Sequence, residues 1–108
     1  MKKDNSMKKI YIICNKDDYF AQDALIGEIE HHNLEFDFTG SINDSDAIIL
    51  IVGANTNNLD GFFQELNIAK NLDKPLLAIY SHSLNFSCDD FTIYKWDWNR
   101  IESFIRNL

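Results

Sequence analysis

Short apolar runs alternate with amphipathic stretches along the whole chain. The run IYIIC at residues 10–14, the run AIILIV at 47–52 and the run LLAIY at 76–80 contain hydrophobic residues only. Continuous apolar runs of this length are typical of strands that are covered on both faces. We therefore predict buried parallel strands at these three places. The segment 47–52 is the most hydrophobic, so we expect it to be the central strand.

Amphipathic helices are predicted between these strands and after the last one. Apolar residues recur at helical spacing from residue 18 to about residue 32, and again from residue 61 onward. Asp60 is well placed to cap the second helix, and Lys74-Pro75 ends it. Asp97 is placed to cap a third helix. The apolar face of this third helix consists of Trp98, Ile101, Ile105 and Leu108.

Two weaker strand candidates, at 35–38 and 91–94, complete the order β-α-β-β-α-β-β-α. This order predicts an α/β fold, a three-layer flavodoxin-like arrangement with a mostly parallel five-stranded sheet. The polar stretch TGSINDSD at 39–46 is a compact link. We expect residues 1–8 to be a disordered tail and 9–108 to form one domain. In folds of this kind ligands bind outside the carboxyl ends of the strands.

Composition and charge narrow the range of partners. Seventeen acidic residues against ten basic ones give a net charge of −7, which disfavours nucleic acid as a partner. The apolar runs are too short for a signal peptide or a membrane span, so we expect a cytoplasmic protein without a membrane partner. The two cysteines, Cys14 and Cys88, lie outside any metal-ligand spacing. We therefore expect free thiols and no metal site.

Glu65 is the strongest candidate for chemistry. Its helical neighbours at i−3, i+3, i+4 and i+7 are the apolar residues Phe62, Ile68, Ala69 and Leu72. A carboxylate on an apolar face is partly removed from water, which prepares it for proton transfer or for stabilising developing positive charge. The alternative is an exposed helix carboxylate, but that usually has a basic residue four positions on, where Glu65 has Ala69. We expect Glu65 to lie near the strand ends.

Four segments, taken together, resemble one family of proteins. They are IYIICNKDDY at 10–19, DSDAIILIVGANT at 44–56, FFQELNIAKNLDKPLLAIY at 62–80 and WDWNRIESFIRNL at 96–108. In order and spacing these segments resemble the TIR-like domains of bacterial defence proteins, above all those of Thoeris-type systems. The resemblance covers nearly the whole chain from Lys9. It implies a flavodoxin-like fold and cleavage of the nicotinamide–ribose bond of NAD.

The resemblance also implies roles for particular residues. The catalytic glutamate of the family falls on Glu65, and NAD is the substrate, with no further cofactor or metal implied. With Thr39 added from the polar link, the substrate-binding set is Cys14, Asn15, Asp17, Thr39, Asn55 and Thr56. N-glycosidic cleavage passes through an oxocarbenium-like state that a carboxylate can stabilise. The implied product is a nucleotide signal in anti-phage defence, with a separate effector protein and a homo-oligomer as further partners.

Two other interpretations stay open. Asp60-Gly61, Glu65, Ala69 and Lys74-Pro75 also resemble the pattern of nucleoside 2-deoxyribosyltransferases and related hydrolases, and the compact link 39–46 fits that pattern. In that family the glutamate is the nucleophile at the ribosyl C1′. The two enzyme interpretations therefore agree on Glu65 and on the type of bond, and they differ in the base that leaves. The third interpretation is a non-catalytic TIR-like module that binds a nucleotide or acts as an adaptor, which the short link also supports.

Overall fold

Parallel strands form the single sheet of the described chain. The computed structural model describes residues 8–34, 36–57, 59, 62–84, 88–89 and 91–108. The strands in these ranges are β1 (Lys8–Cys14), β2 (Phe36–Phe38), β3 (Ala47–Val52), β4 (Leu76–Tyr80) and β5 (Ile93–Lys95). Their spatial order is β2-β1-β3-β4-β5, and each neighbouring pair is parallel. The predicted α/β class, the parallel sheet and the central position of 47–52 are confirmed.

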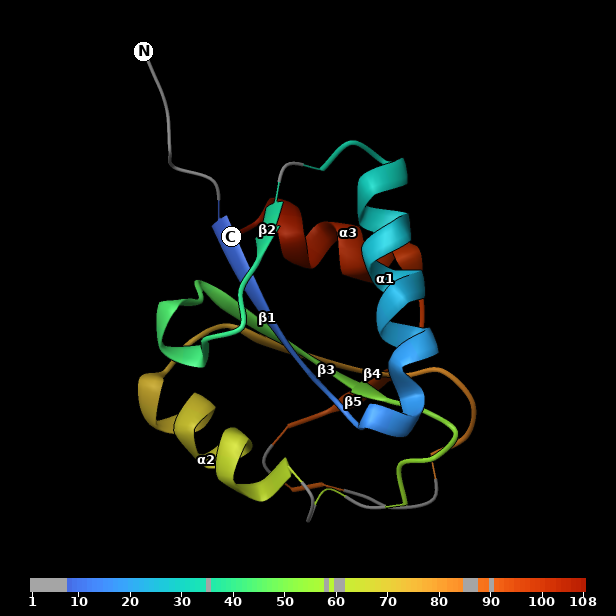
Figure 1. Cartoon of the computed structure of the whole chain (residues 1–108), viewed down its shortest axis with the longest axis vertical. Coiled ribbons are helices and arrows are strands. Elements are labelled where there is room, and N and C mark those ends of the chain that lie inside the picture. The colour runs from blue at the N-terminus through green and yellow to red at the C-terminus, as the bar shows by residue number, and fades with distance from the viewer. Residues whose placement is uncertain (1–7, 35, 58, 60–61, 85–87, 90) are drawn as a thin grey trace.

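Helices cover both faces of this sheet (Figure 1). Helices α1 (Tyr19–His31) and α3 (Trp98–Arg106) lie on one face, and α2 (Phe63–Leu72) lies on the other. Two short 3-10 turns, η1 (Lys16–Asp18) and η2 (Ile42–Asp44), follow β1 and β2. Asp97 caps α3 as predicted, because its side chain accepts a hydrogen bond from the Asn99 N–H at 3.1 Å. Within the described ranges, no helix is long and apolar enough to cross a membrane.

Alternating side chains of the strands supply two separate cores. Neighbouring residues of a strand point to opposite faces, so each buried strand contributes to both layers. The core under α1 and α3 contains Ile10, Leu25, Ile29, Ile49, Ile51, Leu77, Ile79, Ile101 and Ile105. The core under α2 contains Ile13, Ile48, Leu50, Val52, Phe62, Leu66, Ala69 and Ala78. This division explains why the central run is apolar at every position.

Helix α2 differs from the predicted helix in its apolar face. Phe62 and Ala69 are buried as expected, and Leu66 is buried with them. Ile68 and Leu72, however, are 42% and 39% exposed, so the apolar stripe around Glu65 is only partly covered. The helix ends at Leu72, where the next residue, Asp73, adopts a left-handed conformation. The predicted cap, Asp60, lies outside the described residues.

The strand register shows where the exit loops meet. Strand β2 ends at Phe38, which pairs with Ile10, four residues before the end of β1. Cys14, the last residue of β1, pairs with Ile51 of β3. The chain leaves β1 for β2 on one side, and β3 lies on the other side, so the β1–β3 boundary is the topological switch point. Crevices at such points are the usual ligand sites of this architecture.

Candidate functional site

A buried aspartate joins the two loops at the switch point. Asp18 lies at the start of α1 and is only 5% exposed. Its Oδ1 accepts hydrogen bonds from the backbone N–H of Asn55 at 2.9 Å and from the side-chain amide of Asn55 at 3.0 Å. Its Oδ2 accepts one from the hydroxyl of Thr56 at 2.8 Å. Three donors therefore satisfy a carboxylate that is otherwise costly to bury.

Gly53 allows this close approach. A Cβ atom at position 53 would lie 2.4 Å from Cγ of Asp18 and 2.7 Å from its Oδ1, too near for any side chain. Thr56 turns back to the same glycine: its Oγ1 accepts from the Gly53 N–H at 3.2 Å, and its N–H donates to the Gly53 carbonyl at 3.2 Å. The sequence G-A-N-T after β3 is thus explained by the packing of a loop on Asp18.

Asn15 and Asp17 complete this arrangement. Oδ1 of Asn15 accepts the N–H of Asp17 at 2.9 Å, and the side-chain amide of Asn55 donates to the Asp17 carbonyl at 2.8 Å. Four of the predicted site residues, Asn15, Asp17, Asn55 and Thr56, therefore do come together. We call these four, with Asp18 and Gly53, the switch-point cluster. Most of its polar groups bind one another, while Asp17 is exposed at the surface.

Glu65 lies apart from this cluster, on the α2 face of the sheet. Its half-buried carboxylate accepts a hydrogen bond through Oε2 from the hydroxyl of Tyr11, in the middle of β1. Tyr11 precedes the last residue of β1 by three positions, so its backbone lies about 10 Å back from the strand end. Among the described residues Glu65 accepts no other hydrogen bond, so none of them donates to its Oε1. We call these two residues the Tyr11–Glu65 pair.

The hydroxyl of Tyr11 holds its proton firmly. Burial raises the pKa of Tyr11 to about 12, and the hydrogen bond to Glu65 and the charge of that carboxylate act in the same direction. At neutral pH the tyrosine is therefore a hydrogen-bond donor, and it fixes one oxygen of the carboxylate. A carboxylate that is oriented in this way, with its second oxygen available, can act on a developing positive charge or as a nucleophile.

Cys14 faces away from the Tyr11–Glu65 pair. Its side chain packs on the face covered by α1 and α3, and its thiol donates to the carbonyls of Asn15 and Asp18 at 3.5 Å. Burial, and secondly the charge of Asp18, raise the pKa of this thiol to about 11. The thiol therefore stays protonated at neutral pH and is a poor nucleophile.

Thr39 lies nearer to Glu65 than to the switch-point cluster along the strand direction. Its N–H donates to the Ile10 carbonyl at 3.0 Å, which continues the β2 register to the level of Tyr11. Its Oγ1 accepts the N–H of Ser41 at 3.1 Å, within the polar link. The predicted site residues thus divide between two places on the molecule.

Lys74 fixes the polar link beside α2. Its ammonium group donates to the carbonyls of Ile42, Asn43 and Ser45 at 2.8, 3.0 and 2.6 Å. Ile42 also packs against the core under α2. The lysine therefore positions the link, a function that its place after a helix did not indicate.

Sequence reasoning missed Tyr11, Asp18 and Gly53. A tyrosine within a buried strand carries a hydroxyl that needs a partner, and this was an available signal for Tyr11. Asp18 precedes α1, yet its side chain makes no capping hydrogen bond and reaches the β3 loop instead. Nothing in the local sequence identifies that partner, which lies 38 positions away.

Comparison with models of known protein families gives no match, and neither does comparison with curated proteins. Within the described part of the chain, no three His, Cys, Asp or Glu side chains converge as a metal-binding group. The function must therefore be argued from the two places where polar side chains meet, the switch-point cluster and the Tyr11–Glu65 pair.

Proposed function

We propose that the protein cleaves the N-glycosidic bond between a base and a ribose, with Glu65 acting at the ribosyl C1′. The Tyr11–Glu65 pair is the observation that carries this proposal. Oε1 of Glu65 bonds to C1′ as the bond to the base breaks, and the base takes the electron pair of that bond. Water then attacks C1′, loses a proton to solvent and releases the carboxylate, as in hydrolysis with retention.

The properties of Tyr11 favour a base that leaves without being protonated. A hydroxyl whose pKa is raised to about 12 is a weak general acid at neutral pH. The nicotinamide of oxidised NAD is a positively charged pyridinium, so the electron pair of the broken bond neutralises it. We therefore propose NAD as the substrate. This choice agrees with the resemblance to TIR-like domains, which supports a nucleotide signal in bacterial defence, a separate effector protein and self-association.

The remaining predicted residues take two different parts in this proposal. Asp17, exposed beside the switch point, and Thr39, level with Tyr11, are the substrate contacts that remain open to a ligand. Asn55 and Thr56 act as positioning residues, because their polar groups already bind Asp18. Cys14 supports the loop and does not contact the substrate.

A deoxyribonucleoside is the second candidate substrate. The polar link is short and is held closed on α2 by Lys74, which agrees with the compact link of the deoxyribosyltransferase pattern. Glu65 would have the same role at C1′. The base would then leave with a negative charge and would need a proton, for which Tyr11 is poorly suited.

The test compares leaving groups on one purified protein. Wild type is incubated at high protein concentration with oxidised NAD, with reduced NAD and with thymidine, and nicotinamide or free base is followed by chromatography. We expect turnover of oxidised NAD only, and a loss of about a thousandfold in Glu65→Gln. Glu30→Gln, an equal charge change on the exposed face of α1, is the control. Turnover of thymidine alone establishes the second candidate, and turnover of neither substrate supports the non-catalytic module.

A further inference from the structure

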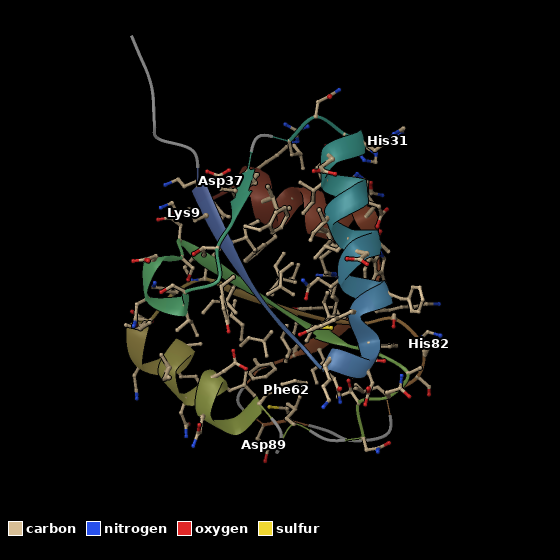
Figure 2. All side chains as sticks on the ribbon, in the orientation of Figure 1. Lys9, His31, Asp37, Phe62, His82 and Asp89 are labelled. Carbon is tan, nitrogen blue, oxygen red and sulfur yellow. The ribbon has the colours of Figure 1, made fainter. Side chains whose placement is uncertain are left out.

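A hollow with aromatic walls lies on the opposite face of the sheet from Glu65. Its volume is about 480 Å³, and it is lined by Phe20, Ala21, Ala24, Ser81, His82, Lys95 and Trp96. The first three residues come from the first turns of α1. Ser81 and His82 follow β4, Lys95 ends β5 and Trp96 follows it. Figure 2 shows His82 beside these first turns of α1. This volume is within the range of small-molecule sites, about 300–1,000 Å³.

Two aromatic rings form the apolar part of this hollow. Phe20 is 91% exposed, although it is a large hydrophobic residue. Trp96 is half-buried, and its indole N–H donates to Oε1 of Glu28 at 2.9 Å. This hydrogen bond fixes the indole ring and engages the neighbouring carboxylate. Because both rings line the same hollow, an aromatic ligand bound there would have aromatic side chains to pack against.

Two nitrogen donors stand beside these rings. Within the part of the chain that the structure describes, Lys95 forms no ion pair and no hydrogen bond through its side chain. Nδ1 of His82 lies 3.0 Å from the hydroxyl of Ser81, and no other described residue bonds to its imidazole ring. The hollow therefore has one permanent positive charge, in a protein whose net charge is −7. A single cation matches a single negative charge, whereas a phosphate dianion would need more donors.

We propose that this hollow binds a small aromatic carboxylate. The ring of the ligand lies between Phe20 and Trp96, and its carboxylate accepts hydrogen bonds from the Lys95 ammonium group and from His82. The hollow and the Tyr11–Glu65 pair lie on different faces of the sheet. Binding at this hollow can therefore be tested independently of the proposed glycosidase activity.

The test uses 2-naphthoate as the probe and titration calorimetry as the measurement. We expect wild type to bind 2-naphthoate with a dissociation constant in the millimolar range or tighter. Lys95→Met removes the charge but keeps the chain length, and should weaken binding about tenfold or more. Phe20→Ala should weaken it about tenfold through loss of the ring contact. The neutral alcohol 2-naphthylmethanol should bind as weakly to wild type as 2-naphthoate binds to Lys95→Met.

Matched variants keep this test specific. Lys9→Met is an equal charge change at the other end of the sheet, where Figure 2 shows Lys9, and Tyr19→Ala removes an exposed aromatic ring that does not line the hollow. Both should bind 2-naphthoate as wild type does. No binding to wild type, or binding that Lys95→Met and Phe20→Ala leave unchanged, overturns the proposal. A dimer in light scattering that Phe20→Ala dissociates also overturns it, because a second copy would then occupy the hollow.

Discussion

Asp18 and Glu65 are two carboxylates removed from water in different ways. Asp18 is almost fully buried and receives three hydrogen bonds from the β3 loop. Glu65 is half-buried and receives one, from Tyr11, within the described part of the chain. Both oxygens of Asp18 accept hydrogen bonds from the loop after β3, whereas only one oxygen of Glu65 accepts a hydrogen bond from a described residue. The number of donors around a carboxylate therefore distinguishes Asp18, which the fold satisfies, from Glu65, for which we propose a chemical role.

Changing both acids to their amides should separate the two roles most strongly. Asp18→Asn leaves the side-chain volume almost unchanged but replaces one accepting oxygen by an NH₂ group. This NH₂ group faces a hydrogen-bond donor of the β3 loop, so we expect the free energy of unfolding to fall by about 3 kcal/mol. Glu65→Gln keeps an acceptor for Tyr11 and should cost less than about 1 kcal/mol. Urea denaturation measures both. Equal losses in the two variants would mean that Glu65 also serves the fold.

A substitution at Gly53 tests whether packing against Asp18 explains the glycine. In Gly53→Ala the new methyl group collides with the Asp18 carboxylate, and we expect a loss of about 2 kcal/mol in unfolding free energy. Asp18→Ala removes the colliding carboxylate but keeps the Asp18 Cβ, which would lie 2.7 Å from the new methyl group. In this background the added cost of Gly53→Ala should therefore fall only to about half. The double-mutant cycle, measured by urea denaturation, gives this coupling. Additive losses would show that another contact excludes the side chain.

Lys74→Met should destabilise the polar link 39–46 beside α2 and leave the switch-point cluster intact. Carbonyls of the polar link lose their donor, so we expect a loss of about 1.5 kcal/mol. Hydrogen exchange should become about tenfold faster at the amides of Asp44 and Ser45, which bond within the link. Exchange at the Asn55 amide, bonded to Asp18, should stay as in wild type. Lys16→Met is the control, and faster exchange at Asn55 would show that the two regions unfold together.

The sequence predicted an element of the fold well where its residue pattern is typical of one kind of structure. The apolar run 47–52 is typical of a strand covered on both faces, and it is buried throughout. The last strand was predicted at 91–94 but is found at Ile93–Lys95, because an edge strand has one neighbour and hydrophobicity does not fix its register. Helix α2 has more apolar positions than its buried face can hold. Leu66 packs against the sheet and is buried, whereas Ile68 stays exposed.

The candidate site was harder to predict, because its contacts join distant parts of the chain. Glu65 could be selected from its apolar neighbours, but its partner Tyr11 lies 54 positions away. Asn55 and Thr56 have the chemistry of ligand-binding residues, and only the position of Asp18 shows that their polar groups are already engaged. Spacing within one element reveals a side chain that is free to act. It does not reveal a distant side chain that satisfies it.

Alkaline pH gives the smallest effect and tests the Tyr11–Glu65 pair alone. Tyrosine in an unfolded chain titrates near pH 10, whereas burial beside Glu65 raises the pKa of Tyr11 to about 12 in the folded protein. Between these values the unfolded state loses a proton that the folded state keeps. The contribution of Tyr11 is therefore fully present below pH 10 and is lost as the pH rises toward 12. Allowing for solvent screening at a half-buried site, we expect this loss to be on the order of 1 kcal/mol.

The measurement is urea denaturation at a series of pH values from 8 to about 12, the window in which both states titrate. Tyr11→Phe should lose stability less steeply than wild type above pH 10, because it has no hydroxyl to titrate. Tyr94→Phe removes an exposed tyrosine of β5 and should keep the wild-type slope. Cys14 contributes a loss of the same sign, since burial raises its pKa to about 11, but this is common to all three proteins. If the unfolding free energy of Tyr11→Phe fell with pH as steeply as that of wild type, Glu65 would not hold the tyrosine proton. The proposed chemical role of Glu65 would then lose the support of its hydrogen bond to Tyr11.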